Sequence, residues 1–108
     1  MYKFQEKDWK LFRKKLPGWQ EDYMGKLCHI YIDILSKDAN PSSRFWELSD
    51  RMKKDKRNPG VIIDDMSRSQ MWGHILDLYD FGVITMDDLS EFSDSLKKTI
   101  AFLRPQDE

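Results

Sequence analysis

The sequence predicts an all-α fold, a compact bundle of four or five helices that ends in an antiparallel helical hairpin. Apolar residues recur with the 3.6-residue period of a helix along most of the chain. Pro and Gly residues divide the chain into segments of helical length. Only residues 61–63, which are β-branched and apolar, suit a short strand, and no second strand is evident for them to pair with. At 108 residues the chain is expected to form one helical domain over residues 1–108.

The first two predicted helices are separated by Pro17 and Gly18. The first helix covers about residues 6–16, and the second covers residues 19–36. The apolar stripe of the first consists of Trp9, Phe12 and Leu16. The apolar face of the second consists of Tyr23, Leu27, Ile30, Tyr31 and Ile34. We expect the second helix to be the longest and to occupy the centre of the bundle, and we expect Pro17 to end the first.

A third helix is predicted to begin at Pro41 or Ser42, because proline suits the first turn of a helix. Its expected apolar stripe is formed by Phe45, Leu48 and Met52. A basic cluster lies at its C-terminal end, where positive charge complements the helix dipole. The turn formers of residues 58–60 should end this helix.

The last predicted helices are joined by a very short connection. The fourth carries Met71, Trp72, Ile75, Leu78 and Tyr79 at helical spacing. Gly82 should end it in the left-handed conformation that glycine favours. Thr85 followed by Asp88 resembles a capping box at the start of the fifth helix. The stripe of that final helix, which ends before Pro105, is formed by Leu89, Phe92, Leu96, Ile100 and Leu103.

Composition narrows the class of protein. Cys28 is the single cysteine, which rules out an intrachain disulfide and any cysteine-based metal site within one chain. The first 15 residues are charged, unlike a secretory signal. The longest run without a charged side chain, residues 69–76, is too short to cross a bilayer. These features predict a cytoplasmic protein that does not enter membranes.

The net charge of −1 conceals an uneven distribution. Residues 1–60 hold 14 basic and 9 acidic side chains, whereas residues 61–108 hold 4 and 10. Two interpretations remain open. The two halves attract each other within one fold, or the basic half presents a surface to an acidic partner.

No catalytic or cofactor-binding motif is present. The sequence has no Gly-rich phosphate loop, no His-Glu-x-x-His pattern and no nucleophile elbow. Cys28, His29 and His74 fall on different predicted helices or faces, and nothing marks an orienting acid beside them. We therefore expect a non-enzymatic protein without a metal or another cofactor.

The basic cluster is the best candidate for a functional surface. It consists of Arg51, Lys53, Lys54, Lys56 and Arg57. With Trp46 nearby, these side chains could contact phosphates while the indole stacks on a base, so nucleic acid is one candidate partner. Asp50 and Asp55 interrupt the cluster, however, and the isoelectric point of about 6.1 is low for a nucleic-acid-binding domain.

Aromatic residues are numerous, with four Trp, four Tyr and six Phe. A domain of this size cannot comfortably bury all of them, and exposed aromatic residues are favoured at protein interfaces. A dense aromatic core is the alternative. The leading functional hypothesis is therefore a protein-interaction or regulatory module that binds an unknown protein or a second copy of itself. A small nucleic-acid-binding regulator that uses residues 51–57 is the runner-up.

Several stretches resemble a group of small, uncharacterised bacterial proteins, some of which carry the label "multidrug transporter". The similar stretches are Tyr2-Lys3-Phe4, Glu6 to Lys10, Trp19-Gln20-Glu21, Tyr23-Met24, Asn40-Pro41-Ser42, Phe45-Trp46, Met66 to Ser69, Gly82 to Leu89 and Glu91-Phe92-Ser93. The resemblance implies a small cytoplasmic helical protein and brings no active site with it. The transporter label conflicts with the lack of a membrane-spanning segment.

Residues 66–69 precede the fourth predicted helix. Ser67 or Ser69 is expected to cap that helix. Arg68 is then available for a carboxylate or phosphate of a partner, and we include it among the candidate partner-binding residues.

Overall fold

The computed structural model describes residues 1–105 and confirms the all-α class. Its α-helices are α1 (Glu6–Leu35), α2 (Pro41–Asp55), α3 (Met71–Asp80) and α4 (Asp94–Leu103). Two short 3₁₀ helices, η1 (Arg68–Gln70) and η2 (Met86–Leu89), precede α3 and α4. No strand occurs within the described residues, and residues 61–63 form a turn and irregular backbone. The last three residues of the predicted domain, 106–108, lie outside the described part.

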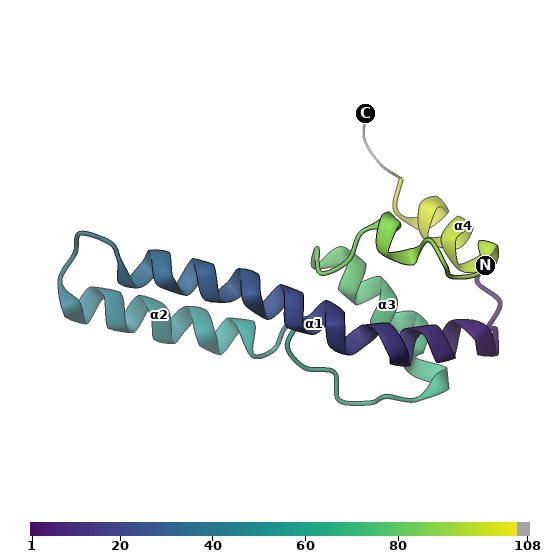
Figure 1. Cartoon of the computed structure of the whole chain (residues 1–108), viewed down its shortest axis with the longest axis horizontal. Helices are drawn as coiled ribbons and strands as arrows, with labels where there is room; N and C mark the ends of the chain where they lie inside the picture. The colour runs from purple at the N-terminus through teal and green to yellow at the C-terminus, as the bar shows by residue number, and fades with distance from the viewer. Residues whose placement is uncertain (106–108) are drawn as a thin grey trace.

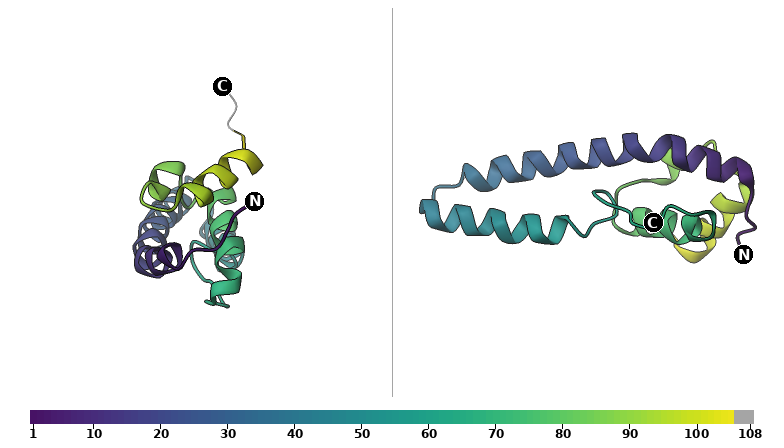
Figure 2. Two further views of the ribbon diagram at one scale, coloured as in Figure 1. Left: turned by 90° about the vertical axis from the view of Figure 1, so that its right-hand side faces the viewer. Right: turned by 90° about the horizontal axis from the view of Figure 1, so that it is seen from below.

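The molecule is elongated, with extents of 52 × 34 × 18 Å. Its radius of gyration is 16.6 Å, against about 13 Å for a compact chain of this length. The second half of α1 pairs with α2 to form an arm (residues 20–57), and the first half of α1 joins α3 and α4 in a head (residues 1–19 and 61–105), as Figures 1 and 2 show. The structure therefore does not confirm the predicted compact bundle.

Helix α1 is continuous for 30 residues, so the predicted interruption at Pro17 is wrong. A proline inside a helix removes one backbone hydrogen bond and crowds the preceding turn, at a cost of about 3 kcal/mol. Packing of the residues on both sides of Pro17 offsets that cost. Leu16 is buried before the proline, and the Trp19 ring lies 6.0 Å from that of Phe92 after it. Both contacts belong to the head core, which therefore holds the two halves of α1 in line.

The core lies in the head. It consists of Trp9, Phe12, Leu16, Met71, Ile75, Leu78, Ile84, Leu89, Phe92, Leu96 and Ile100. These residues come from α1, α3, η2, α4 and the loops between them. The apolar spacing predicted for the fourth helix is confirmed, because α3 buries Met71, Ile75 and Leu78 completely.

The junction after α3 is only partly as expected. Gly82 has a φ of 75° and ends α3, while the Val83 and Gly82 amides donate to the carbonyls of Leu78 and Tyr79, the pattern of a Schellman motif. The Thr85–Asp88 capping box is also present. The capping box lies at the start of η2, however, and α4 begins later, after Ser93. Residues 81–93 thus separate α3 from α4, and the expected tight hairpin is not confirmed.

Ser93 divides the predicted final helix because it is bound to a buried carboxylate. Asp8 of α1, which is fully buried, accepts hydrogen bonds from the Ser93 amide (2.8 Å), the Ser93 hydroxyl (2.6 Å) and the Tyr2 hydroxyl (3.0 Å). The Ser93 hydroxyl oxygen in turn accepts from the Leu96 amide and caps α4. The start of α4 is therefore fixed by α1.

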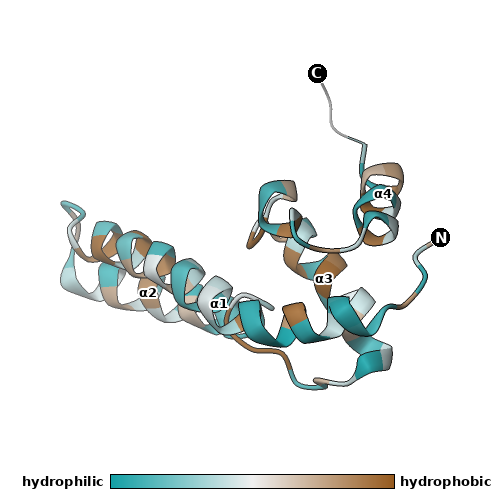
Figure 3. Cartoon of the chain, turned by 45° about the vertical axis from the view of Figure 1, so that its right-hand side comes forward, coloured by the Kyte–Doolittle hydropathy of each residue, from teal (hydrophilic) through white to brown (hydrophobic). Residues whose placement is uncertain are grey.

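Helix α2 begins at Pro41 as expected, but the predicted orientation of its apolar stripe is wrong. The side facing α1 carries polar groups. The Arg44 Nη1 donates to the Leu35 carbonyl (2.8 Å), and the Tyr31 hydroxyl donates to Asp55 (2.6 Å). Phe45 and Met52 are 60% and 38% exposed, and apolar bands remain visible on the arm in Figure 3. Hydrogen bonds to α1 thus select the face of α2 that is buried.

Candidate functional site

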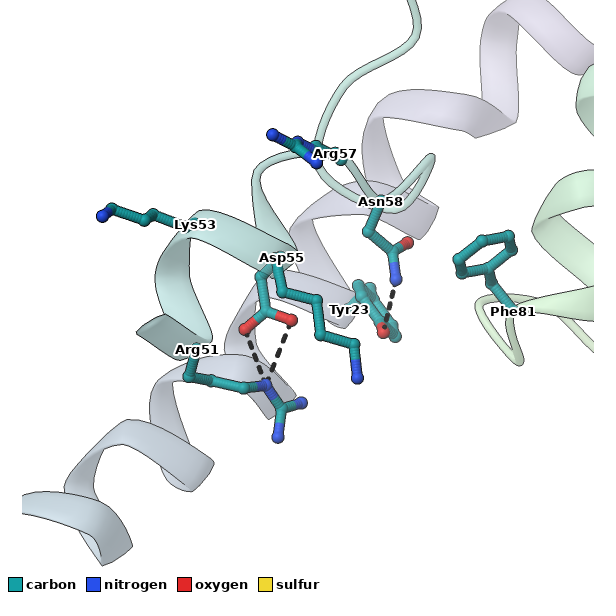
Figure 4. Close-up of a pocket in the computed structure, with 8 residues that line it drawn as sticks. Tyr23, Arg51, Lys53, Asp55, Arg57, Asn58 and Phe81 are labelled. Carbon is teal, nitrogen blue, oxygen red and sulfur yellow. Dashed lines mark hydrogen bonds and ion pairs between the residues drawn. The ribbon is translucent and has the colours of Figure 1, made fainter. Parts of the chain in front are cut away.

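The basic end of α2 forms one wall of an open cavity of about 650 Å³ where the arm meets the head (Figure 4). We call this cavity the basic pocket. It is lined by Tyr23, Arg51, Lys53, Lys54, Asp55, Arg57, Asn58 and Phe81. Four of the five cations of the predicted cluster therefore gather around one hollow. The structure adds Tyr23, Asn58 and Phe81, which sequence analysis did not assign to a site.

Asp55 organises the arm side of the pocket. Its carboxylate is 4% exposed and accepts from the Arg51 Nε at 3.1 and 3.0 Å. The Tyr31 hydroxyl of α1 donates to the same carboxylate. Burial raises the pKa of Tyr31 to about 12, with its hydrogen bond to the Asp55 carboxylate as the next cause. The charge of Asp55 is thus satisfied by the protein's own groups.

The turn after α2 is fastened to α1. The Asn58 Nδ2 donates to the Tyr23 hydroxyl (3.0 Å), and the Asn58 Oδ1 accepts from the Gly60 amide (2.7 Å). The Gln20 side chain donates to the Pro59 carbonyl (3.0 Å). These bonds fix the floor of the pocket before any partner arrives, which reduces the ordering cost of binding.

Gly60 is buried in this turn between arm and head. A Cβ atom at this position would lie 2.8 Å from the Val83 Cγ2 and closer still to the Tyr23 ring. Glycine therefore lets the chain pass between α1 and the loop after α3. This close approach also sets the distance across the pocket.

The cations of the pocket have few internal partners. Within residues 1–105, Lys53, Lys54 and Arg57 form neither an ion pair nor a side-chain hydrogen bond. Arg51 uses its Nε for Asp55, which leaves its terminal nitrogens available. Positive charge near a helix C-terminus also complements the helix dipole. The positive charge of the pocket nevertheless exceeds the single negative charge of Asp55.

Attraction between the two halves of the chain does not use up this charge. Among the ion pairs of the described residues, Lys15–Glu91 (2.8 Å) alone joins a base from residues 1–60 to an acid from residues 61–105. The basic cluster takes no part in such a pair. Within residues 1–105, ion pairs to the acidic half therefore do not neutralise the basic cluster.

Phe81 forms the opposite wall, on the head. It is the C-cap residue of α3 and is 55% exposed. The Schellman turn at Gly82 holds it in place, and Figure 4 shows its ring across the pocket from Tyr23 and Asn58. The sequence signal for Phe81 was the adjacent glycine, because a residue at a helix C-cap often lies at the surface.

Two of the remaining candidates lie elsewhere on α2. Lys56 borders a smaller groove of about 290 Å³, which we call the α2 groove; its lining is Phe45, Leu48, Ser49, Met52, Lys53 and Lys56. Trp46 is 59% exposed and contacts the Phe45 ring edge-on at 5.0 Å. Trp46 does not line the basic pocket, so the expected combination of indole and basic cluster is not assembled there.

Arg68 lies in the head and is not part of the basic pocket. Its guanidinium forms a two-nitrogen ion pair with Glu6 (2.9 to 3.3 Å) and lies 5.6 Å from the centre of the Trp9 ring. This pair lowers the pKa of Glu6 and raises that of Arg68, in each case mainly through the side-chain hydrogen bond. The geometry assigns Arg68 a role in joining η1 to α1.

The expected capping by Ser67 or Ser69 is wrong. Neither η1 nor α3 has a side-chain hydrogen bond at its N-cap. The two serine hydroxyls lie 3.3 Å from each other instead. The Arg68–Glu6 pair, which comes from a distant part of the chain, replaces the local cap as the contact that positions this segment.

The residues considered for nucleophilic chemistry are not brought together. Cys28 and His29 lie on the arm and are exposed. The His74 ring contacts the Asp65 carbonyl in the head. Within residues 1–105, no three side chains of the metal-ligating types form a group that could hold a metal ion.

Comparisons with known proteins give no match to a family model, a curated protein or a solved structure. None of the helices in the described part of the chain is long and apolar enough to span a membrane.

Proposed function

We propose that this protein is a non-enzymatic protein-interaction module that binds an acidic segment of a partner protein in the basic pocket. The observation that carries the proposal is the gathering of Lys53, Lys54 and Arg57, which have no internal partner within residues 1–105, around a preformed cavity. Carboxylates of a partner would supply the missing counter-charges.

The shape of the pocket suits a peptide that also carries an apolar side chain. Phe81 and Tyr23 provide ring surface between the cations, and aromatic residues of this kind are common anchors in interfaces. The fastened turn at Asn58 keeps the cavity open. A short acidic segment with one central apolar residue is the partner chemistry that fits best.

A role without catalysis is supported by the composition of the pocket lining. Asp55 is the carboxylate among the described lining residues, and it is already bound by Arg51 and Tyr31. A general base must reach the proton that it removes. The lining residues otherwise offer cations, an amide, a phenol and a phenyl ring, which are groups suited to recognition.

Protein is favoured over nucleic acid as the partner for two reasons. Trp46, the residue predicted to stack on a base, does not line the pocket. The chain also has a net charge of −1, whereas a nucleic-acid footprint usually makes a domain clearly basic.

Fluorescence anisotropy tests the proposal with a labelled peptide whose Glu-rich ends flank a central Leu. We expect binding that weakens with added salt and is lost when Gln replaces Glu in the peptide. The double variant Lys54→Glu/Arg57→Glu should weaken binding about tenfold or more, because two attractions become repulsions. Lys98→Glu, an exposed position on α4, is the matched control and should bind normally.

Two results would overturn the proposal. One is absence of peptide binding at low salt. The other is binding of single-stranded or duplex nucleic acid that the double variant abolishes while the acidic peptide does not bind. The second result would establish the nucleic-acid alternative.

A further inference from the structure

We infer that a second copy of this chain docks on the outer face of α2, so that two arms pair in an antiparallel, twofold arrangement. The inference starts from the orientation of α2. The helix buries Asp55 and half-buries Arg44 and Arg51 against α1, while Phe45 and Trp46 remain 60% and 59% exposed. An amphipathic helix that turns its aromatic residues outward has a surface that the described chain does not cover.

The outward-facing residues form one continuous stripe, in which Ser49 is half-buried. Phe45, Ser49, Met52 and Lys56 follow one another at spacings of four, three and four residues, which places them on the same side of the helix. The α2 groove runs along this stripe. Ser49 lies at its centre, and a small residue at that point allows a second helix to approach closely.

The distribution of charge along the stripe selects the direction of the second copy. Lys53 lies in the C-terminal half of α2 and Lys56 is its C-cap residue, whereas the N-terminal end of the stripe presents Ser42, Phe45 and Trp46. A parallel pair of helices would bring like charges together. An antiparallel pair that crosses at Ser49 places the lysines of each copy beside the aromatic end of the other copy's stripe. The charged residues of that half of α2, Arg44 and Glu47, lie outside the stripe and are bound to Leu35 and Lys37.

Helical geometry then gives two specific contacts, each formed twice. Trp46 faces Lys53 of the second copy, a cation–π pair in which tryptophan is the strongest acceptor. Phe45 faces Met52 of the second copy, a sulfur–aromatic contact. The same face on both molecules is thus complementary to itself, as a twofold interface requires.

The area available indicates a weak dimer. A fully covered Phe or Trp buries about 150–250 Å², so covering the exposed part of Phe45 and Trp46 on both copies removes roughly 500 Å² of mainly apolar surface from water. With Met52 and the lysine stems added, the interface falls in the size range of transient complexes. We therefore expect a weak, reversible dimer.

This surface is distinct from the basic pocket except for Lys53, which borders both. Lys53 is therefore left unchanged in the tests of either surface. Peptide binding depends on Lys54 and Arg57, and self-association depends on Phe45 and Trp46, so one proposal can fail without the other.

Sedimentation equilibrium over about three decades of concentration tests the dimer. We expect a reversible monomer–dimer equilibrium whose dissociation constant rises about tenfold or more in Trp46→Glu. Phe102→Glu is the matched control, because Phe102 is an 81% exposed aromatic residue on α4, and it should dimerise normally. Circular dichroism should show that both variants remain folded, since neither side chain is buried.

Disulfide trapping tests the crossing point in a Cys28→Ser background. Ser49→Cys should form a disulfide-linked dimer on mild oxidation. Glu47→Cys should not, because Glu47 points toward Lys37 at the side of the arm (2.6 Å). A monomer at every concentration, equal trapping at both positions, or equal weakening by Phe102→Glu would each overturn the inference.

Discussion

Asp8 illustrates how one buried carboxylate can fix the arrangement of the head. It accepts three hydrogen bonds, two from Ser93 and one from Tyr2, and these residues come from opposite ends of the chain. Sequence analysis missed this role, because Asp8 appears as one acid among many charges in a predicted surface helix. Ser93, which donates two of the three hydrogen bonds that make its burial favourable, lies 85 residues away.

We expect Asp8→Ala to lower the free energy of unfolding by about 3 kcal/mol, because the buried Ser93 amide and hydroxyl would lose their acceptor. Urea denaturation followed by circular dichroism measures this loss. Asp33→Ala, an exposed position on α1, should change the stability by less than about 0.5 kcal/mol. Equal effects of the two substitutions would contradict the role assigned to Asp8.

Two tyrosines should report on buried carboxylates at high pH. Burial raises the pKa of Tyr2 and of Tyr31 to about 12, and the neighbouring Asp8 and Asp55 add to the respective shifts. A raised phenol pKa stabilises the folded state below the ordinary value of 10. That contribution is lost as the pH rises from 10 through about 12.

Tyrosinate absorbance measures this titration. We expect Tyr31→Phe to remove one ionisation near pH 12 and Tyr2→Phe to remove another. If Tyr31→Phe instead removed an ionisation near the ordinary pKa of 10, the buried bond between Tyr31 and Asp55 would not form as described.

Features fixed by local sequence were more predictable than features fixed by distant contacts. The α3 stripe, the stop at Gly82 and the Thr85–Asp88 capping box follow from local sequence, and the structure contains all three. The face of α2 was assigned wrongly, because periodicity identifies an apolar stripe but not the element that covers it. The continuity of α1 through Pro17 depends on core contacts to Phe92, which are likewise not local.

Two glycines should respond in opposite directions to replacement by alanine. Gly25 lies inside α1, and a Cβ atom there would meet nothing within 4 Å. We expect Gly25→Ala to raise the free energy of unfolding by about 0.5–1 kcal/mol, because alanine is the better helix former. Gly60→Ala should lower it by about 2 kcal/mol, since its Cβ would overlap Tyr23 and Val83.

Urea denaturation of both variants provides the measurement. If Gly60→Ala were as stable as the unmodified protein, the turn at Gly60 would not pack as closely between Tyr23 and Val83 as described. If Gly25→Ala were destabilising, this part of α1 would carry a contact that the structure does not show.

At the scale of the whole molecule, the candidate site exists because arm and head are joined at a fixed angle. The basic cluster could be identified from sequence as a run at a helix end. Its convergence with Phe81 and Tyr23 could not, because that depends on how the loop of residues 58–60 returns the chain to α1. An elongated shape also leaves the arm with two uncovered surfaces, and the two proposals assign one partner to each.

The most direct test of the central claim is an NMR titration of the uniformly ¹⁵N-labelled protein with the Glu-rich peptide. We expect the amide resonances of residues 51–58 and of Phe81 to shift together, because these residues surround one pocket. The Lys54→Glu/Arg57→Glu variant should show no such shifts at the same peptide concentration. Shifts confined to other parts of the head or to residues 42–49, or no shifts at all, would contradict the proposal that the basic pocket receives an acidic partner.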